Sequence, residues 1–439
     1  MTSYWCESAW LADEPVDAVR VVVDDVAGRI TEVTAGTPFR AGDHRLDGLV
    51  TPGFANTHSH AFHRALRGRT HDASGTFWTW RDAMYQVAAT LDPDSYRRLA
   101  TAAYAEMALA GITCVGEFHY LHHPAGGGRY DDPNAMAHAL YDAADVAGVR
   151  LTLLDACYLR GGLSDTGESL PPDEIQRRFV DADVDDWADR VSRLRPTATA
   201  RVGAAAHSLR AVPAEALPTV VAVAAGRPLH AHVSEQLGEN IQVRAAYGAT
   251  PVEVLAAAGA LGPATIAVHA THLTDGDIAT LAASGAGVCL CPTTERDLAD
   301  GVGPAGALAG SGVALSLGSD QHAIVDLFEE SRAVELHERL VTHRRGHFTG
   351  RSLLAMMTET GHAALGWPEA GRIEVGAVAD LVAVRTDSVR TAGARPDQIV
   401  LAAAASDVHA VVNAGRLVVS DGHHVLGDIG QLLTDAIGP

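Results

Sequence analysis

The chain has 439 residues, of which 47% are hydrophobic and 20% charged, a balance typical of globular proteins and not of disordered or membrane-spanning ones. Its formal net charge of −21 argues against a nucleic-acid partner, because proteins that bind nucleic acids carry a basic surface. No stretch approaches the roughly 20 apolar residues of a membrane-spanning helix, and the first residues lack the layout of a signal peptide. We therefore expect no membrane partner and a cytoplasmic location.

The two ends of the chain share one kind of pattern. Residues 1–48 and 368–439 contain short β-branched runs, such as residues 380–384, separated by glycine and aspartate. Such runs, bounded by turn-forming residues, are typical of strands. Residues 408–419, with Gly415 near the middle, fit a hairpin. We expect one small β-sandwich domain built from both termini.

Between these ends, residues 49–367 alternate short apolar strands with amphipathic segments. Residues 94–110, for example, have a helical pattern and are followed by Gly111, a common helix terminator. Repeated strand–helix units form parallel sheets, and eight of them suggest an α/β fold of the TIM-type (β/α)8 barrel class. The strands that we predict span residues 49–60, 112–119, 150–158, 200–208, 227–235, 265–273, 287–294 and 314–320.

Chemically capable side chains stand at the end of nearly every predicted barrel strand. In a TIM-type barrel the C-terminal ends of all strands meet on one face, which carries the active site. Residues far apart in the sequence would therefore share one pocket. The strand-end residues are His58, His60, His119, Tyr120, His207, His232, Glu235, His269, Thr293, Thr294 and Asp320.

His58 and His60 are separated by one residue, so in a strand their side chains point the same way. His232 and Asp320 end two other strands of the same barrel, and the first and eighth strands are neighbours once the barrel closes. A catalytic zinc or iron ion needs at least three nitrogen or oxygen donors and one position for water. We predict one divalent metal ion per chain, most simply zinc, with these four side chains as its ligands.

Two more strand-end residues suit proton transfer beside that metal ion. Glu235 lies three residues after His232 and fits a proton carrier better than a ligand. His269 ends the next strand and could hydrogen-bond the attacking oxygen or the substrate. His272 is the rival for this role, and a loop position is its simpler interpretation.

Four motifs resemble those of the amidohydrolase superfamily, and the resemblance covers nearly the whole chain: residues 57–60, 230–235, 268–273 and 317–320. Within that superfamily, four further segments are most similar to the N-formimino-L-glutamate deiminases of histidine degradation: residues 58–64, 77–81, 117–122 and 207–210. The resemblance implies a homodimeric zinc hydrolase. Its reaction would convert N-formimino-L-glutamate and water to N-formyl-L-glutamate and ammonia.

The resemblance also assigns roles to the catalytic residues. Asp320 would accept a proton from the attacking water. Glu235 and His269 would protonate the imine nitrogen, orient the tetrahedral adduct and help ammonia leave.

Further roles concern substrate binding. Arg81 and Arg210 would grip the two carboxylates of the substrate, since a guanidinium pairs with a carboxylate through two parallel hydrogen bonds. Tyr120 and His207 would make further contacts. At position 63 this chain has histidine where many relatives have glutamine; His63 would still contact the substrate by donating one hydrogen bond, and the exchange bears on which substrate is bound.

Two alternatives stay open at this stage. One is a superfamily deaminase or hydrolase acting on guanine, an adenosine derivative or a triazine, because the metal ligands alone do not choose among these substrates. Two arginines in the pocket would disfavour such neutral rings. The other is a metal-binding protein without catalysis, which Glu235 and His269 argue against.

Overall fold

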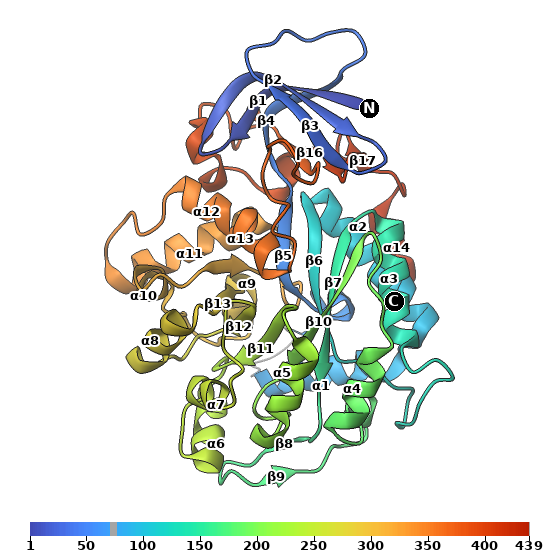
Figure 1. The fold of residues 1–439 in the computed structure, drawn as a ribbon, viewed down its shortest axis with the longest axis vertical. Helices are drawn as coiled ribbons and strands as arrows, with labels where there is room; N and C mark the ends of the chain where they lie inside the picture. The colour runs from blue at the N-terminus through green and yellow to red at the C-terminus, as the bar shows by residue number, and fades with distance from the viewer. Residues whose placement is uncertain (71–76, 439) are drawn as a thin grey trace.

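The computed structural model describes residues 1–70 and 77–438. Within them, two eight-stranded sheets organise the chain, one at each end of the long axis (Figure 1). The terminal sheet, at the top of Figure 1, is built from β1 Thr2–Leu11, β2 Glu14–Asp24, β3 Arg29–Thr34, β4 His44–Pro52, β15 Leu381–Val384, β16 Val408–Asn413, β17 Arg416–Ser420 and β18 His423–His424.

The second sheet is the barrel, and every neighbouring pair in it runs parallel. A parallel bridge between Ser59 and Asp320 joins its first strand to the segment after its last, so the ring is nearly closed. The expected α/β barrel is therefore confirmed. Its strands are β5 Phe54–Ser59, β6 Ile112–His119, β7 Arg150–Cys157, β10 Ala200–Ala206, β11 Leu229–Val233, β12 Thr265–His269, β13 Gly287–Leu290 and β14 Leu315–Leu317.

Helices surround the barrel and a short hairpin, β8 Gly162–Leu163 with β9 Ser169–Leu170, follows β7 (Figure 1). The α-helices are α1 Phe77–Thr90, α2 Pro93–Leu109, α3 Ala135–Ala147, α4 Val184–Ser192, α5 Leu217–Ala224, α6 Leu237–Tyr247, α7 Pro251–Ala257, α8 Asp275–Ser284, α9 Pro292–Asp297, α10 Ala305–Gly310, α11 Leu327–Thr342, α12 Gly350–Met357, α13 Glu359–Ala364 and α14 Ile429–Ile437. Among the described residues, none of these helices is both long and apolar enough to cross a membrane.

The second of these helices shows why the local sequence folds as expected. Asp92 caps the N-terminus of α2 by accepting a hydrogen bond from the Ser95 backbone, and Pro93 fills the first turn, where no backbone donor is needed. Gly111 follows the helix with a φ of 89°, which glycine adopts without steric cost. The helix predicted over residues 94–110 is therefore confirmed.

One strand expectation was wrong. The apolar run that we assigned to a single strand, residues 49–60, divides at Gly53 into β4 of the terminal sheet and β5 of the barrel. A Cβ atom at Gly53 would lie 2.4 Å from Thr113 Oγ1 and 2.7 Å from Asp380 Cβ. Glycine is therefore needed where the chain passes from one sheet to the other.

The terminal sheet joins the two chain ends, as the sequence indicated. In it β4 pairs with β1 on one side and with β15 on the other. Side chains of β1 and β2 share a hydrophobic core with those of β15 and β16, which fits the expected small β domain. The hairpin predicted over residues 408–419 is formed by β16 and β17.

Candidate functional site

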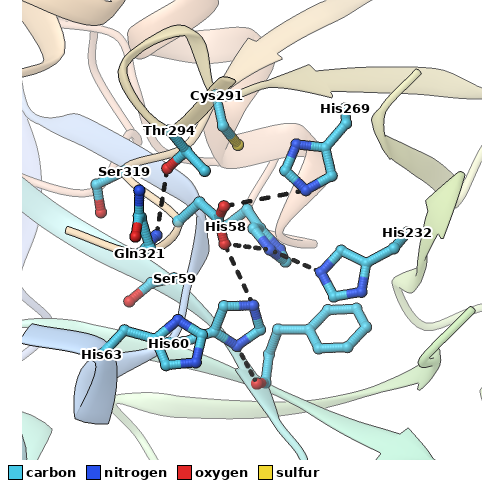
Figure 2. Close-up of polar contacts among 12 residues, drawn as sticks. His58, Ser59, His60, His63, His232, His269, Cys291, Thr294, Ser319 and Gln321 are labelled. Carbon is cyan, nitrogen blue, oxygen red and sulfur yellow. Dashed lines mark hydrogen bonds and ion pairs between the residues drawn. The ribbon is translucent and has the colours of Figure 1, made fainter. Parts of the chain in front are cut away.

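The four predicted metal ligands converge at the C-terminal end of the barrel strands. His58 is the penultimate residue of β5 and His60 follows that strand, His232 lies in β11, and Asp320 follows β14. Their donor atoms all lie within 4.8 Å of one another, and all four residues are buried. Asp320 Oδ1 is 3.2 Å from His58 Nε2 and 3.3 Å from His60 Nε2. Figure 2 shows the three imidazoles turned toward a common centre.

The hydrogen-bond partners of the histidine Nδ1 atoms, which point away from the cluster, indicate whether these side chains suit a metal ion. His60 Nδ1 is 2.9 Å from the Phe118 carbonyl oxygen, and His232 Nδ1 is 2.8 Å from that of His207. Because a carbonyl oxygen can only accept, each Nδ1 carries the proton and each Nε2 presents a lone pair. The lone pair of His232 Nε2 faces His58 Nε2 at 3.1 Å. Such converging electron donors fit a divalent cation.

Burial supports the same protonation state. It lowers the pKa of His58 to about 3 and takes the pKa of His232 well below its usual value. Both rings are therefore neutral near pH 7, as metal coordination requires. The donor set of three imidazoles and one carboxylate is one that zinc and iron(II) accept.

Glu235 and His269 lie beside this cluster and complete the predicted catalytic group. His269 Nε2 is 3.9 Å from Glu235 Oε1 and 4.0 Å from Asp320 Oδ2. Burial alone lowers the pKa of His269, but the negative charges of Glu235, Glu295 and Asp320 outweigh it and raise that pKa well above its usual value. Arg210 Nη2 lies 3.5 Å from Glu235 Oε2. Donors and acceptors of protons thus surround one side of the cluster.

A cavity of about 400 Å³ opens over the cluster. All five residues that we predicted to bind substrate line it: His63, Arg81, Tyr120, His207 and Arg210. Within it, His63 Nε2 is 2.8 Å from the Tyr120 hydroxyl. The structure therefore brings together the predicted metal, catalytic and substrate-binding residues in one place.

Four strand-end residues do not belong to the described lining of this cavity. One is the candidate metal ligand His58, which is fully buried; the other three are His119, Thr293 and Thr294. Successive side chains of a strand alternate in direction, so Tyr120 points into the cavity and His119 points away. The Thr293 hydroxyl donates to Glu330, and that of Thr294 accepts from the Gln321 backbone at 3.3 Å. These residues support the site from outside.

His119 belongs instead to a second buried group with His122 and Asp155. The Asp155 carboxylate accepts hydrogen bonds from Arg190 Nη1 and Nη2 at 2.9 and 3.0 Å, and from the Trp187 indole at 3.0 Å. Because these donors already satisfy the carboxylate, this group is an ion-pair network and not a second metal centre.

The rival histidine also lies outside the cavity lining. His272 Nε2 is 2.8 Å from the Asp300 carbonyl oxygen, and its own carbonyl accepts from Asn240. Its side chain therefore stabilises the loop after β12, in agreement with the simpler interpretation.

Sequence reasoning missed two features of the site. One is an aromatic wall of the cavity, formed by Trp80, Tyr85, Tyr158 and Phe179. Tyr158 ends the third predicted strand, so the strand-end argument applied to this residue would have found it. The other is Glu295, a buried carboxylate 3.6 Å from His269 Nδ1. It follows Thr294, and its position just beyond the strand was its signal.

Comparisons with known proteins agree with this arrangement. Residues 49–418 match the model of the Amidohydrolase family. The chain is 37% identical over 403 residues to a formimidoylglutamate deiminase of Pseudomonas aeruginosa, covering 87% of each chain. It is 31% identical over 418 residues to a 5-methylthioadenosine/S-adenosylhomocysteine deaminase of Halobacterium salinarum, covering 91% of this chain and 88% of that one.

A solved structure gives the same result. The crystal structure of an amidohydrolase from Brucella melitensis superposes with a TM-score of 0.91 at 32% identity, covering 100% of this chain and 99% of that one. Both the resemblance seen in the motifs and the barrel fold are thereby confirmed. The chain belongs to the Amidohydrolase family, whose members use a divalent metal ion, and it is a hydrolase acting on C–N bonds.

Proposed function

We propose that the protein hydrolyses N-formimino-L-glutamate to N-formyl-L-glutamate and ammonia. The observation that carries this proposal is the presence of Arg81 and Arg210 in the same cavity as the candidate metal ligands. The substrate has a cationic formamidine at one end and two carboxylates at the other. The carboxylates of Glu235 and Asp320 suit the first, and two guanidinium groups suit the second. The formimidoylglutamate deiminase from Pseudomonas aeruginosa supports this choice.

One divalent metal ion per chain belongs to this function, and we propose zinc. A zinc ion there would supply Lewis-acid activation of a water molecule, which is what hydrolysis of an amidine carbon near neutral pH requires. Iron(II) accepts the same donors and is the alternative. The residues that would hold the ion are His58, His60, His232 and Asp320.

The chain's own residues move the protons. Asp320 Oδ2 faces His269 and would accept the proton that water loses as its oxygen adds to the formimino carbon. Because the formamidine is cationic, addition of the oxygen gives a neutral adduct with a hydroxyl and an amino group, and His269 would hydrogen-bond the adduct oxygen. Glu235 would take the hydroxyl proton and deliver it to the amino nitrogen. When the C–N bond breaks, the nitrogen leaves as ammonia, the carbon–oxygen double bond forms, and Asp320 gives its proton back to solvent. Arg81 and Arg210 would hold the glutamate end still throughout.

A deaminase of a purine derivative is the second candidate. The aromatic wall of the cavity, with Trp80, Tyr85 and Tyr158, could stack against a heterocyclic ring. The relative from Halobacterium salinarum is named for such a substrate. A neutral ring, however, brings no carboxylate for the guanidinium groups of Arg81 and Arg210 to bind, and for this reason we rank this candidate second.

Ammonia release by the zinc-loaded protein tests the proposal. We expect turnover of N-formimino-L-glutamate, none of guanine or adenosine, loss of activity on chelation and its return with zinc. Turnover of a purine alone would keep the metal assignment but overturn the assignment of the two arginines. Turnover of none of the three compounds would overturn the formimino proposal.

A place in histidine degradation and a homodimeric, cytoplasmic state complete the proposal. The first is what the resemblance to the N-formimino-L-glutamate deiminases of histidine degradation implies. Sedimentation velocity tests the homodimer. A single species of about 46 kDa, the mass of one chain, would contradict it.

A further inference from the structure

His269 has two ring nitrogens, and the proposed function uses only one of them. Its Nε2 faces Glu235 and Asp320 on the cavity side. Its Nδ1 points to the opposite side, where the nearest ionic partner is Glu295 Oε1 at 3.6 Å. Both His269 and Glu295 are buried. A carboxylate therefore stands behind the imidazole that is placed to act on the substrate.

Glu295 is itself held in place by its neighbours. It lies in α9, which begins directly after the barrel strand β13, and its Oε1 accepts a hydrogen bond from the Cys291 backbone nitrogen at 2.9 Å. The adjacent Arg296 turns outward and pairs with Glu329 at 2.9 Å. Within the described residues, the ionic contact found for Glu295 is the one with His269. Its carboxylate is thus fixed by the backbone and aimed at the imidazole.

The backbone conformation and the ring orientation of His269 both require support from neighbouring residues. His269 has a φ of 68°, in the left-handed region that side-chain-bearing residues seldom adopt. Such a backbone conformation persists where the surrounding structure holds it, and the ring, which turns about its own side-chain bond, needs a partner of its own to fix its orientation. A ring flip would exchange the nitrogen that faces the cavity for a carbon, unless an acceptor behind the ring holds Nδ1–H in place.

We infer that Glu295 is a positioning residue that accepts the Nδ1 proton of His269, fixes the ring and so presents Nε2 to the substrate. The 3.6 Å separation shortens to hydrogen-bond length when substrate fills the cavity, as catalytic contacts do on formation of the enzyme–substrate complex. The inference rests on the role of His269 in the proposed function. It adds to that function a fixed carboxylate–imidazole pair, contributed by the end of β12 and by the helix that follows the neighbouring strand β13.

Two substitutions of Glu295 separate the effect of losing the hydrogen-bond acceptor from the effect of changing the side chain. Glu295→Met in the zinc-loaded enzyme removes the acceptor, and we expect kcat to fall about 100-fold with KM changed less than threefold. Glu295→Gln keeps an oxygen that can accept from Nδ1, and we expect kcat within about fivefold of the wild type. Arg296→Met, on the same helix, is the matched control and should leave both constants unchanged.

Metal content and melting temperature are measured beside the kinetic constants. Both should stay at wild-type values in Glu295→Gln. A Glu295→Met enzyme with kcat within threefold of the wild type would overturn the inference. So would a Glu295→Gln enzyme as slow as Glu295→Met, because the carboxylate charge and not the hydrogen-bond acceptor would then matter.

A readout without substrate keeps the test independent of folding defects and of the proposed function. In holoenzyme labelled with ¹⁵N-histidine, we expect a ring N–H signal at Nδ1 of His269, identified by its loss in His269→Gln. The signal should persist in Glu295→Gln. Finding His269 without a proton on Nδ1 in the wild type would overturn the inference, whereas absence of formimino turnover would overturn the proposed function alone.

Discussion

Ser59 and Asp320 are joined by a parallel backbone bridge at the seam where the barrel closes. Around it, the Asp320 nitrogen donates to the His58 carbonyl at 3.0 Å, and the His60 nitrogen donates to the Asp320 carbonyl at 3.2 Å. Three candidate metal ligands therefore sit on the two strand ends that close the ring. A metal ion bound there would hold together segments more than 250 residues apart in the sequence.

Metal removal should therefore lower stability as well as activity. A ligand that binds only the folded state stabilises it by about 2.7 kcal/mol at 100 times its dissociation constant. We expect chelation to lower the melting temperature by several degrees, and zinc to restore both the melting temperature and ammonia release. Differential scanning calorimetry of the loaded and stripped protein measures the difference.

The control for this prediction uses the second His/Asp group. His232→Gln removes a candidate ligand and should abolish most of the response to zinc. His119→Gln alters the ion-pair network beside Asp155 and should leave the difference between loaded and stripped protein intact. Equal responses in the two variants would contradict the assignment of the ligands.

Glu235→Gln should separate catalysis from metal binding. The amide keeps the size of the side chain but cannot carry a proton, and loss of a general acid or base costs about 10²- to 10⁴-fold in rate. We expect kcat to fall by that range while zinc content stays near the wild-type value. Steady-state ammonia release and elemental analysis measure these quantities. Full turnover would show that Glu235 is not the proton carrier.

The sequence predicted the barrel and most of the site because both follow from a repeated pattern. Each apolar strand ends where a polar residue begins, and the barrel brings those ends to one face. The pattern fails at Gly53, where the apolar run continues but the close approach of Thr113 and Asp380 divides it between two sheets. That division depends on tertiary neighbours, which local sequence does not encode.

The same limit explains the errors at individual strand ends. His119 and Tyr120 are adjacent, and the sequence does not tell which of the two points inward until the register of β6 is known. Glu295 was missed for a related reason, since its relation to His269 arises from two strands that pair only in the folded barrel.

Arg210 should contribute to substrate binding more than to rate. A hydrogen-bonded charge pair is worth about 1.5–3 kcal/mol, so Arg210→Met should raise KM for N-formimino-L-glutamate about 10- to 100-fold. Arg210→Lys should recover little, because an ammonium lacks the planar fork of a guanidinium. Arg395→Met, at an exposed ion pair with Asp397, is the control and should leave KM unchanged. Unaltered KM in Arg210→Met would contradict the assignment.

An ion pair between Asp380 and Arg150 links the terminal sheet to the barrel. Arg150 donates to the two carboxylate oxygens of Asp380 at 2.8 and 2.6 Å. Burial raises the pKa of Asp380, but the charge of Arg150 outweighs it and holds that pKa well below its usual value. The stabilisation is therefore complete above the ordinary carboxyl pKa of about 4 and is lost as the pH falls toward the folded-state pKa. Asp380→Asn should cost about 3–5 kcal/mol in urea unfolding at pH 7, and the difference from the wild type should shrink below about pH 4. The exposed Asp397→Asn is the control and should change little at either pH, while a pH-independent effect at Asp380 would show that the charge is not its cause.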